Sequence, residues 1–303
     1  MNLQLATPQI TTDFETWLIG HGRSPITSRA YIRDLNLFTK YYQVVNSEPF
    51  SPELINSIDL RGWRQHSLDI EKVSPATWNR RRVSMTVFCQ WAQDAELINM
   101  DPSAELQGAK QQQLPPRWLT NSEFGRYMRM VEQLLNAAQT EPAMRQAVRD
   151  QAMVMMMAYC GLRVEELCAL DLGDVHISER KGKVVVRSGK GGKKREIPLN
   201  AEVRRVLKQW LLNHPGGEPA IFVGKHGERI TARGVQKRVS DIGKMVGLDM
   251  TPHRLRHTFA KRQVDSGVPL TVISQLMGHS RLETTARYCQ PGWEDMEKAV
   301  EKI

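Results

Sequence analysis

The ten residues Gln151–Cys160 (QAMVMMMAYC) constrain the fold more than any other stretch, because they are apolar nearly all round a helix. A surface helix keeps one polar face, so a helix without one has to be enclosed by other elements. The run is shorter than the roughly 18 residues of a membrane span, and Gly161 ends it. It therefore predicts a helix that crosses the core of a soluble domain, with its methionines packed rather than binding a cofactor.

Helical patterns dominate residues 11–107 and predict a short bundle of helices. A first helix is expected over Asp13–Ile19, and three Ser-Pro pairs open the next three helices, with proline at the first helical position. These pairs are Ser24-Pro25, Ser51-Pro52 and Ser74-Pro75. We expect the third helix to run on through Ile58 with a break near Asp59. The fourth carries apolar residues on one side: Val83, Val87, Phe88 and Trp91.

The stretch Ala109–Arg117 (AKQQQLPPR) predicts a linker, because it is polar and ends in a proline pair that cannot continue a helix. It divides the chain into an N-terminal domain over residues 1–108, a linker over 109–118 and a C-terminal domain over 119–303.

The C-terminal domain is predicted to be mainly helical with one small sheet. A helix with an N-cap at Thr120 precedes the central one, and helices are expected again over Ala201–Leu212 and Thr231–Val246. Between them lie three short β runs joined by turns rich in glycine and lysine, which predict a three-stranded antiparallel sheet: Val175–Ile177, Val184–Val186 and Arg195–Leu199. The fold class is therefore mainly α, an N-terminal helical bundle plus a mixed α+β domain.

The positive charge is concentrated in the C-terminal part. The net charge is +9, while residues 1–107 carry ten basic and twelve acidic side chains, so the remainder carries a balance of +11. This distribution favours a polyanionic partner, although from charge alone a merely basic soluble protein remains an alternative. The four cysteines show no CxxC spacing, which favours free thiols over a disulfide framework or a zinc site. The N-terminus has acidic residues where a signal peptide needs an apolar core, so a cytoplasmic location is expected.

Five side chains suited to phosphoryl chemistry gather between residues 253 and 288: His253, Arg256, His257, His279 and Tyr288. His253 and Arg256 lie three apart on a predicted helix and therefore leave the same face. A second helix ends at Gly278, His279 follows at once, and a third short helix from about Leu282 carries Tyr288. Taken singly, each has an ordinary explanation, such as a surface pair on a helix or a packed tyrosine. Together they indicate phosphoryl transfer without a metal.

The order and spacing of several motifs resemble the tyrosine recombinase (phage integrase) family over the whole C-terminal domain. The N-terminal bundle more weakly resembles the family's core-site-binding, SAM-like domain, with Arg80, Arg81 and Arg82 as contacts to DNA. The motifs that carry the resemblance are Gly161–Leu167, Gly189-Lys190-Gly191, Lys194–Leu199, Thr251–Ala260, Leu276–Ser280 and Thr284–Tyr288.

The resemblance implies roles for individual residues. Tyr288 would be the nucleophile, forming a 3′-phosphotyrosyl link and freeing a 5′-hydroxyl, and Arg163 and Arg256 would clamp the phosphate, since guanidinium forks suit its oxygens. A phenol with a pKa near 10 needs a proton acceptor, and His253 is the nearest candidate. The remaining implied roles are Lys190 as the general acid at the leaving oxygen, His279 as a hydrogen-bonding partner of the phosphate, and Glu166 as an orienting group.

Other residues near these motifs receive minor roles. Lys193 and Lys194 compete with Lys190 and are expected, like Arg254, to contact DNA phosphates, whereas His257 is interpreted as structural. No metal, cofactor or ATP is expected, because the protein–DNA intermediate conserves the energy of the broken bond.

The resemblance favours the simple two-domain recombinases, of the Xer type or carried on transposons and plasmids. It implies double-stranded DNA with an inverted-repeat core site, in the nucleoid. It also implies a homotetramer in which a tail helix over Glu294–Val300 docks on a neighbouring protomer, with a second recombinase or accessory protein as a further partner. The alternatives are a type IB topoisomerase and a non-catalytic DNA-binding regulator.

Overall fold

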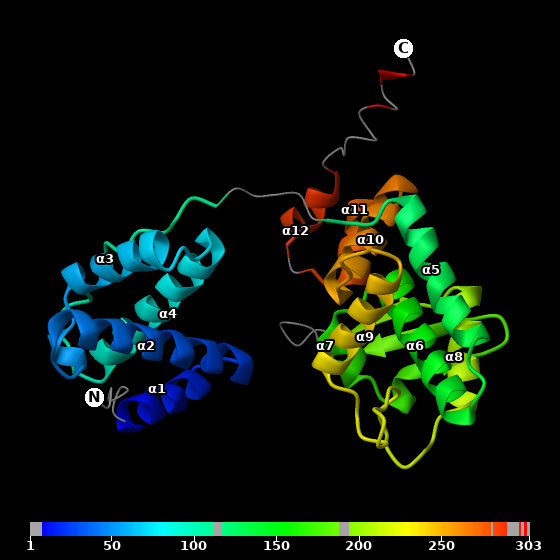
Figure 1. Ribbon diagram of the computed structural model, residues 1–303, viewed down its shortest axis with the longest axis horizontal. Coiled ribbons are helices and arrows are strands. Elements are labelled where there is room, and N and C mark those ends of the chain that lie inside the picture. The colour runs from blue at the N-terminus through cyan, green and yellow to red at the C-terminus, as the bar shows by residue number, and fades with distance from the viewer. Residues whose placement is uncertain are drawn as a thin grey trace. The chain divides into compact units, whose positions relative to one another are not determined.

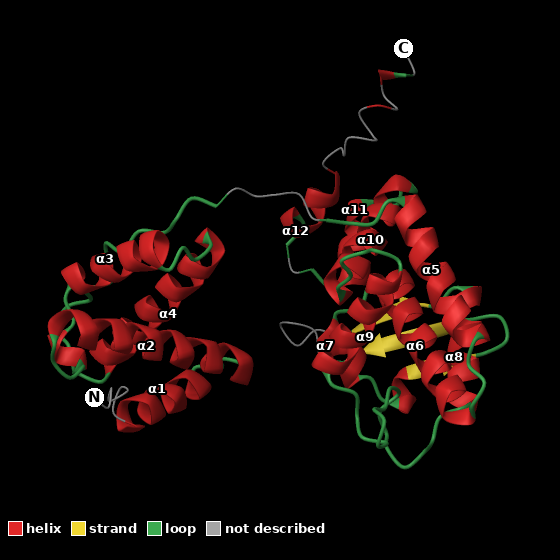
Figure 2. Cartoon of the chain, in the orientation of Figure 1, coloured by secondary structure: helices red, strands yellow, loops and turns green. Residues whose placement is uncertain are grey.

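The computed structural model describes residues 8–111, 117–187, 194–279, 281–289, 297, 300 and 301. The chain forms two compact units, Met1–Gln113 and Leu114–Ile303 (Figure 1), and each has its own hydrophobic core. Both units are mainly helical and only the second contains a sheet among its described residues (Figure 2), which confirms the predicted fold class.

The N-terminal unit is built from four helices, α1 (Pro8–Gly20), α2 (Pro25–Asn46), α3 (Ser57–Gln65) and α4 (Pro75–Asp94). Ser24 and Ser74 cap α2 and α4 with their side chains, as the Ser-Pro pairs predict. Aromatic side chains fill the core: the rings of Trp63 and Trp78 meet edge to face at 5.6 Å, and both side chains are fully buried.

Three details of this unit differ from the prediction. Helix α1 begins at Pro8 rather than Asp13. The third segment is a 3-10 turn (Pro52–Leu54) followed by α3, and the break falls at Asn56, which caps α3 in a reciprocal capping box with Asp59. Asp59 thus helps to start a helix instead of ending one. In α4 Val83 is 40% exposed, because Trp78, Met85 and other residues turn a different face to the core.

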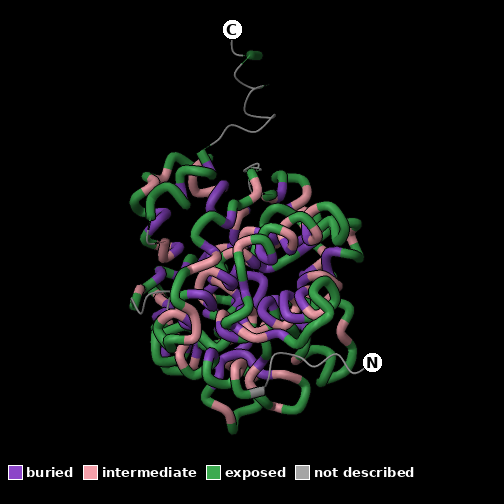
Figure 3. Tube along the Cα trace, turned by 90° about the vertical axis from the view of Figure 1, so that its left-hand side faces the viewer, coloured by how far each residue is buried: buried purple, intermediate pink, exposed green. Residues whose placement is uncertain are grey.

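In the C-terminal unit α6 (Glu141–Cys160) is the central helix, as its apolar sequence predicts. It packs against α5 (Asn121–Asn136), α8 (Ala201–Leu212) and α10 (Pro252–Asp265), and its run Met153–Met157 is buried. Helices α7 (Val164–Ala169) and α9 (Ala232–Met245) pack against each other beside it. Buried and exposed residues alternate along the surrounding helices (Figure 3), so each contributes one apolar face to the core.

The three-stranded antiparallel sheet is confirmed. Its strands are β1 (Val175–Ile177), β2 (Gly182–Val186) and β3 (Arg195–Pro198), in the order β1-β2-β3. Val184 pairs with Val175 on one side and with Ile197 on the other. A 3-10 turn, Leu172–Asp174, leads into β1.

After α10 the chain continues through α11 (Leu270–Met277), α12 (Glu283–Ala286) and the 3-10 turn η4 (Arg287–Cys289). The predicted third short helix therefore ends at Ala286, and Tyr288 lies on the following turn. The predicted tail helix over Glu294–Val300 lies almost wholly outside the described residues. All four cysteines are free thiols, and two of them are buried. No helix in the described part of the chain combines the length and the apolar character of a transmembrane segment.

Candidate active site

The corner between α6 and α7 positions Arg163. Helix α6 ends at Gly161 with φ at 63°, and Arg163 is the N-cap residue of α7. A Cβ on Gly161 would lie 2.4 Å from Cδ1 of Phe259, so a side chain is excluded by both the backbone conformation and the packing. The tight corner turns the Arg163 side chain towards the carbonyls at the end of α11, to which Nη1 (Met277, 3.4 Å) and Nη2 (Gly278, 3.3 Å) donate.

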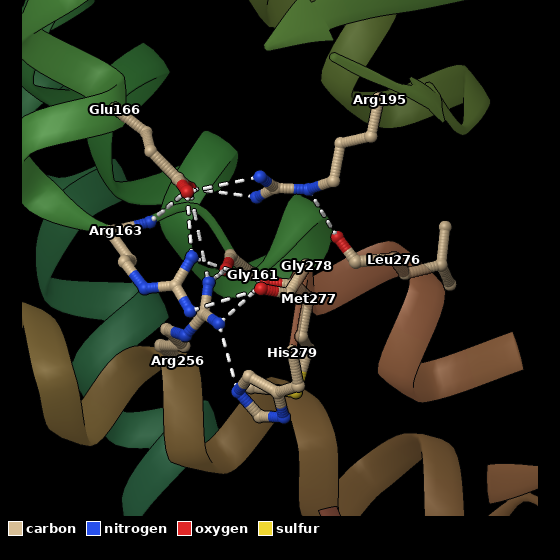
Figure 4. Close-up of polar contacts among 9 residues, drawn as sticks. All are labelled: Gly161, Arg163, Glu166, Arg195, Arg256, Leu276, Met277, Gly278 and His279. Carbon is tan, nitrogen blue, oxygen red and sulfur yellow. Dashed lines mark hydrogen bonds and ion pairs between the residues drawn. The ribbon is translucent and has the colours of Figure 1, made fainter. Parts of the chain in front are cut away.

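Glu166 joins two arginines at the floor of the site (Figure 4). Its carboxylate accepts hydrogen bonds from the backbone N–H (2.9 Å) and Nη1 (2.7 Å) of Arg163 and from both terminal nitrogens of Arg195 (3.0 and 2.7 Å). Burial alone would raise the pKa of Glu166, but the bonds from Arg195 and Arg163 outweigh burial and lower it to about 2. Glu166 is therefore ionised at neutral pH.

Arg256 is buried at the centre of the same cluster, with 3% of its side chain exposed. Its guanidinium donates to the backbone carbonyls of Gly161 and Met277 (2.6 Å to the latter) and contacts Nε2 of His279 at 3.0 Å. Burial and the nearby Arg163 lower its pKa to about 10, which still leaves it cationic at neutral pH.

The hydrogen bonds of His279 determine its tautomer. Because a guanidinium has no acceptor, Nε2 of His279 accepts from Arg256. The proton therefore sits on Nδ1, which donates to Oγ1 of Thr285 at 2.9 Å. Burial, then Arg256 and Arg163, lower the pKa of His279 to about 4, so the ring is neutral at physiological pH.

Tyr288 lies beside this cluster and is only 2% exposed. Its ring packs with Phe259, Ala260, Ile273 and Met277 in a small separate core. Its hydroxyl is 2.6 Å from Nδ1 of His257, and burial raises its pKa although Arg256, Arg287 and Arg163 lower it. The phenol is therefore protonated at neutral pH.

His253, Arg163 and Arg256 line one pocket. Its other described lining residues are Val164, Glu165, Gln236, Ser240, Asp249, Met250, Thr251 and Pro252. The ring of His253 meets that of His257 edge to face at 4.2 Å, since the two residues lie one turn apart on α10. Burial and the charge of Arg256 lower the pKa of His253. The pocket thus holds two arginines and a neutral imidazole, together with the carboxylates of Glu165 and Asp249.

Comparison with known protein families identifies the chain. The model of the phage integrase family matches residues 127–293, and that of the phage integrase N-terminal SAM-like domain matches residues 12–96. The chain belongs to the phage integrase family. It is a tyrosine recombinase, an enzyme of site-specific DNA breakage and rejoining.

Named relatives of this integrase are similar over most of their length. Tyrosine recombinase XerC of Corynebacterium efficiens is 36% identical, covering 88% of this chain and 81% of the relative. XerC of Chromohalobacter salexigens is 30% identical, and the match covers 94% of this chain and 92% of the relative. These matches favour the recombinase over the topoisomerase and regulator alternatives.

Solved structures share the integrase fold at low identity. The XerH site-specific recombinase bound to palindromic difH substrate has a TM-score of 0.73 at 19% identity, covering 92% of this chain and 80% of that chain. A lambda integrase dimer bound to a COC′ core site has a TM-score of 0.69 at 18% identity, and the match covers 92% of this chain and 94% of that chain.

The structure brings most of the predicted site residues of this integrase together. Arg163, Glu166, Arg256 and His279 form one hydrogen-bonded network. His253 shares a pocket with the two arginines, and Tyr288 is joined to α10 through His257. Lys190 and Lys193 lie outside the described residues, while Lys194 is exposed immediately before β3.

The arginines predicted to contact DNA are largely engaged within their own units. Arg80 pairs with the buried carboxylate of Asp34, and Arg82 donates to the Leu106 carbonyl at 3.3 Å. Arg81 is 8% exposed and pairs with Glu71 at 2.6 Å. In the C-terminal unit, Arg254 donates to the Asp249 carbonyl at 2.9 Å and pairs with Glu123 at 3.2 Å.

Sequence reasoning missed two residues of the site. Arg195 stands inside a recognised motif, but its partner Glu166 is 29 residues away, and no local pattern reveals such a pairing. His257 was interpreted as structural, and only the fold brings it to Tyr288.

The sequence also carries a signal for a basic surface on α2. Arg29, Arg33 and Lys40 recur there at helical spacing and are exposed around a shallow pocket.

Proposed function

We propose that this integrase cleaves and rejoins double-stranded DNA with Tyr288 as the nucleophile and Arg163 and Arg256 as the clamps of the scissile phosphate. One observation supports this most: two arginines from distant segments are fixed side by side around Glu166 and the Met277 carbonyl. Tyr288 follows eleven residues after Met277 and contacts His257 of the helix that carries Arg256. Preorganised cations stabilise charge that develops in a transition state without further rearrangement.

The phosphate would occupy the pocket lined by Arg163, His253 and Arg256. Two guanidinium groups can each offer paired N–H donors to the non-bridging oxygens, which gain charge as the phosphorus becomes five-coordinate. His253 would serve as an acid–base group at this phosphate. His279 would hydrogen-bond the phosphate as well, once its proton moves from Nδ1 to Nε2, because a phosphate oxygen only accepts.

The proposed cleavage step forms a bond between Tyr288 Oη and phosphorus and breaks the bond from phosphorus to the 5′-oxygen. The phenol gives its proton to a histidine of α10 as it attacks, and the leaving oxygen gains one from Lys190, with Lys193 or Lys194 as alternatives. Rejoining reverses these transfers with a 5′-hydroxyl of either strand. No ATP is consumed, because one phosphodiester is exchanged for another.

We further propose that residues 1–108 bind the core site and residues 119–303 carry catalysis. Binding of the DNA backbone by cations is largely electrostatic, and the C-terminal part supplies the positive balance. In the N-terminal unit, the exposed Arg29, Arg33 and Lys40 suit phosphate contacts, together with Arg80 and Arg82. Arg81 is instead mostly buried and paired with the partly exposed Glu71. Lys194 and Arg254 would contact DNA from the C-terminal unit.

The assembly we propose is a homotetramer on two inverted-repeat core sites in the nucleoid, with exchange of the C-terminal tail between protomers. The relatives bound to core-site DNA support the DNA partner, and a second recombinase or accessory protein is compatible with this arrangement.

A nicked suicide substrate tests the proposal. When the strand next to the nick is lost after cleavage, the protein stays linked to the 3′ end, so the unsubstituted enzyme should accumulate a covalent adduct in buffer with chelator. Tyr288→Phe should bind the same DNA and form no adduct. An adduct in Tyr288→Phe would contradict the assignment of the nucleophile, and relaxation of supercoils without synapsis would favour the topoisomerase alternative.

A further inference from the structure

The described contacts of Tyr288 single out one acceptor for its proton. Nδ1 of His257 lies 2.6 Å from Tyr288 Oη, which is a short hydrogen bond, and the two ring centroids are 5.5 Å apart. Among the described residues, His257 is the only hydrogen-bond partner of this hydroxyl. The ring of His253 instead meets that of His257 edge to face, and His253 lines the pocket with Arg163 and Arg256.

The protonation states fit a phenol that donates and an imidazole that accepts. Burial, together with the neighbouring His253, Arg287, Arg256 and His279, lowers the pKa of His257 to about 3. His257 is therefore neutral before DNA binds, with one ring nitrogen free of hydrogen. A phenol O–H is far more acidic than a neutral imidazole N–H, so the short bond runs from Tyr288 to His257.

We propose that His257 is a catalytic residue, which takes the Tyr288 proton on Nδ1 as the bond from Oη to phosphorus forms. In rejoining, the proton returns to Oη as that bond breaks, so no outside acid or base is consumed. This inference rests on the proposed function, and it assigns to His257 the proton that the sequence assigned to His253.

The cations around His257 make the transfer depend on DNA. Arg256 and Arg287 disfavour a second positive charge on the ring while the pocket is empty of anion. A phosphate bound between Arg163 and Arg256 supplies negative charge, which raises the pKa of a nearby imidazolium. The tyrosine would therefore be activated only when a phosphodiester is in place, which protects the free enzyme's nucleophile from ionising.

The test compares His257→Asn with a control variant, His226→Asn, on the nicked suicide substrate. An asparagine amide can still hydrogen-bond the phenol but cannot take its proton. We expect His257→Asn to bind DNA normally and to lose about 100-fold in the rate of adduct formation at neutral pH, a typical contribution of a general base. His226→Asn, an exposed turn position, is the control and should leave the rate unchanged.

A fluorinated tyrosine at position 288 separates proton transfer from mere positioning. 3,5-Difluorotyrosine ionises near neutral pH, so it needs little help from a base. With this residue at 288, the loss caused by His257→Asn should shrink to less than about fivefold, while a loss at any other catalytic group persists.

Two results would overturn the inference. One is a His257→Asn enzyme that cleaves at nearly the unsubstituted rate; the other is a loss that stays equally large with difluorotyrosine, which would mean that His257 only holds the ring. In both cases Tyr288→Phe would still be inactive. An active Tyr288→Phe would instead refute the proposed function itself.

Discussion

The guanidinium of Arg256 is held by acceptors from three separate segments: the Gly161 carbonyl, the Met277 carbonyl and the ring of His279. With 3% of the side chain exposed, its position is fixed before any substrate binds. A guanidinium group is flat and forked, so it can donate to these acceptors and still offer N–H groups to a phosphate. A lysine ammonium is a single compact charge and cannot do both.

Arg256→Lys should therefore keep the charge and lose the geometry. We expect DNA affinity within about threefold of the unsubstituted enzyme and a fall of at least about 100-fold in adduct formation, in line with the loss of one oriented transition-state donor. Rates on the suicide substrate and binding by gel shift measure the two effects. Arg262→Lys, on the same helix but stacked on Phe124, is the matched control. Equal losses in the two variants would contradict the role of the fork.

At the same scale, the sequence predicted which residues gather but not how they bond. Arg163, Arg256, His279 and Tyr288 were recognisable from motif spacing, whereas the two bonds of His279 that determine its tautomer depend on the α10–α11 packing. The pairing of Arg195 with Glu166, and of Tyr288 with His257, is likewise a product of tertiary structure.

At the scale of elements, the ends of helices build the site. Helix α6 ends at Gly161 and α11 at Gly278, both with φ at 63°, and their terminal carbonyls are the acceptors for Arg163 and Arg256. Strand β3 begins with Arg195, whose Nε donates to the Leu276 carbonyl at 2.9 Å. The strand that leaves the β2–β3 turn is thereby tied to the end of α11.

Replacing Gly278 tests this arrangement. A Cβ there would lie 2.8 Å from Nη1 of Arg195, which cannot swing away without breaking its bonds to Glu166. Gly267 has a similar φ of 74° but nothing within 4 Å of the added carbon, so Gly267→Ala should lower the free energy of unfolding by only about 1 kcal/mol. Gly278→Ala should lower it by about 2–3 kcal/mol and slow cleavage as well. Equal effects in denaturant titrations would refute the contact.

The helices themselves were largely predictable, and the exceptions have physical reasons. Capping residues such as Thr120 and Ser74 are local signals, so the starts of α5 and α4 follow from sequence. The break before α3 was misplaced, because an Asn-x-x-Asp capping box was not recognised. The predicted buried face of α4 was partly wrong, because Trp78 and Met85 face the core while Val83 lies at the surface.

At the scale of the whole molecule, the lowered pKa values of three histidines in the active site make the folded protein less stable at low pH than at neutral pH. The pKa values of His257 and His279 are lowered to about 3 and about 4, and that of His253 is lowered too. In the unfolded chain all three histidines take up protons near pH 6.5, whereas in the folded chain they take them up only at lower pH. The unfolded state then binds more protons below pH 6.5, so the free energy of unfolding falls as the pH drops.

We expect the midpoint of thermal unfolding of the C-terminal unit to decrease steadily between pH 7 and pH 4.5. A variant with His257→Asn and His279→Asn should show a shallower decrease, because two of the three groups are gone. DNA should reduce the slope as well, since a bound phosphate raises the pKa of the histidines. A midpoint that rises towards acid pH, or equal slopes in the two proteins, would contradict this account.

The most direct measurement is the identity of the residue that carries the DNA. The adduct trapped on the nicked substrate can be digested with nuclease and trypsin and mapped by mass spectrometry. We predict a nucleotide joined through its 3′-phosphate to Tyr288, on the peptide that begins after Arg287. Attachment at any other residue, or through a 5′-phosphate, would contradict the central claim.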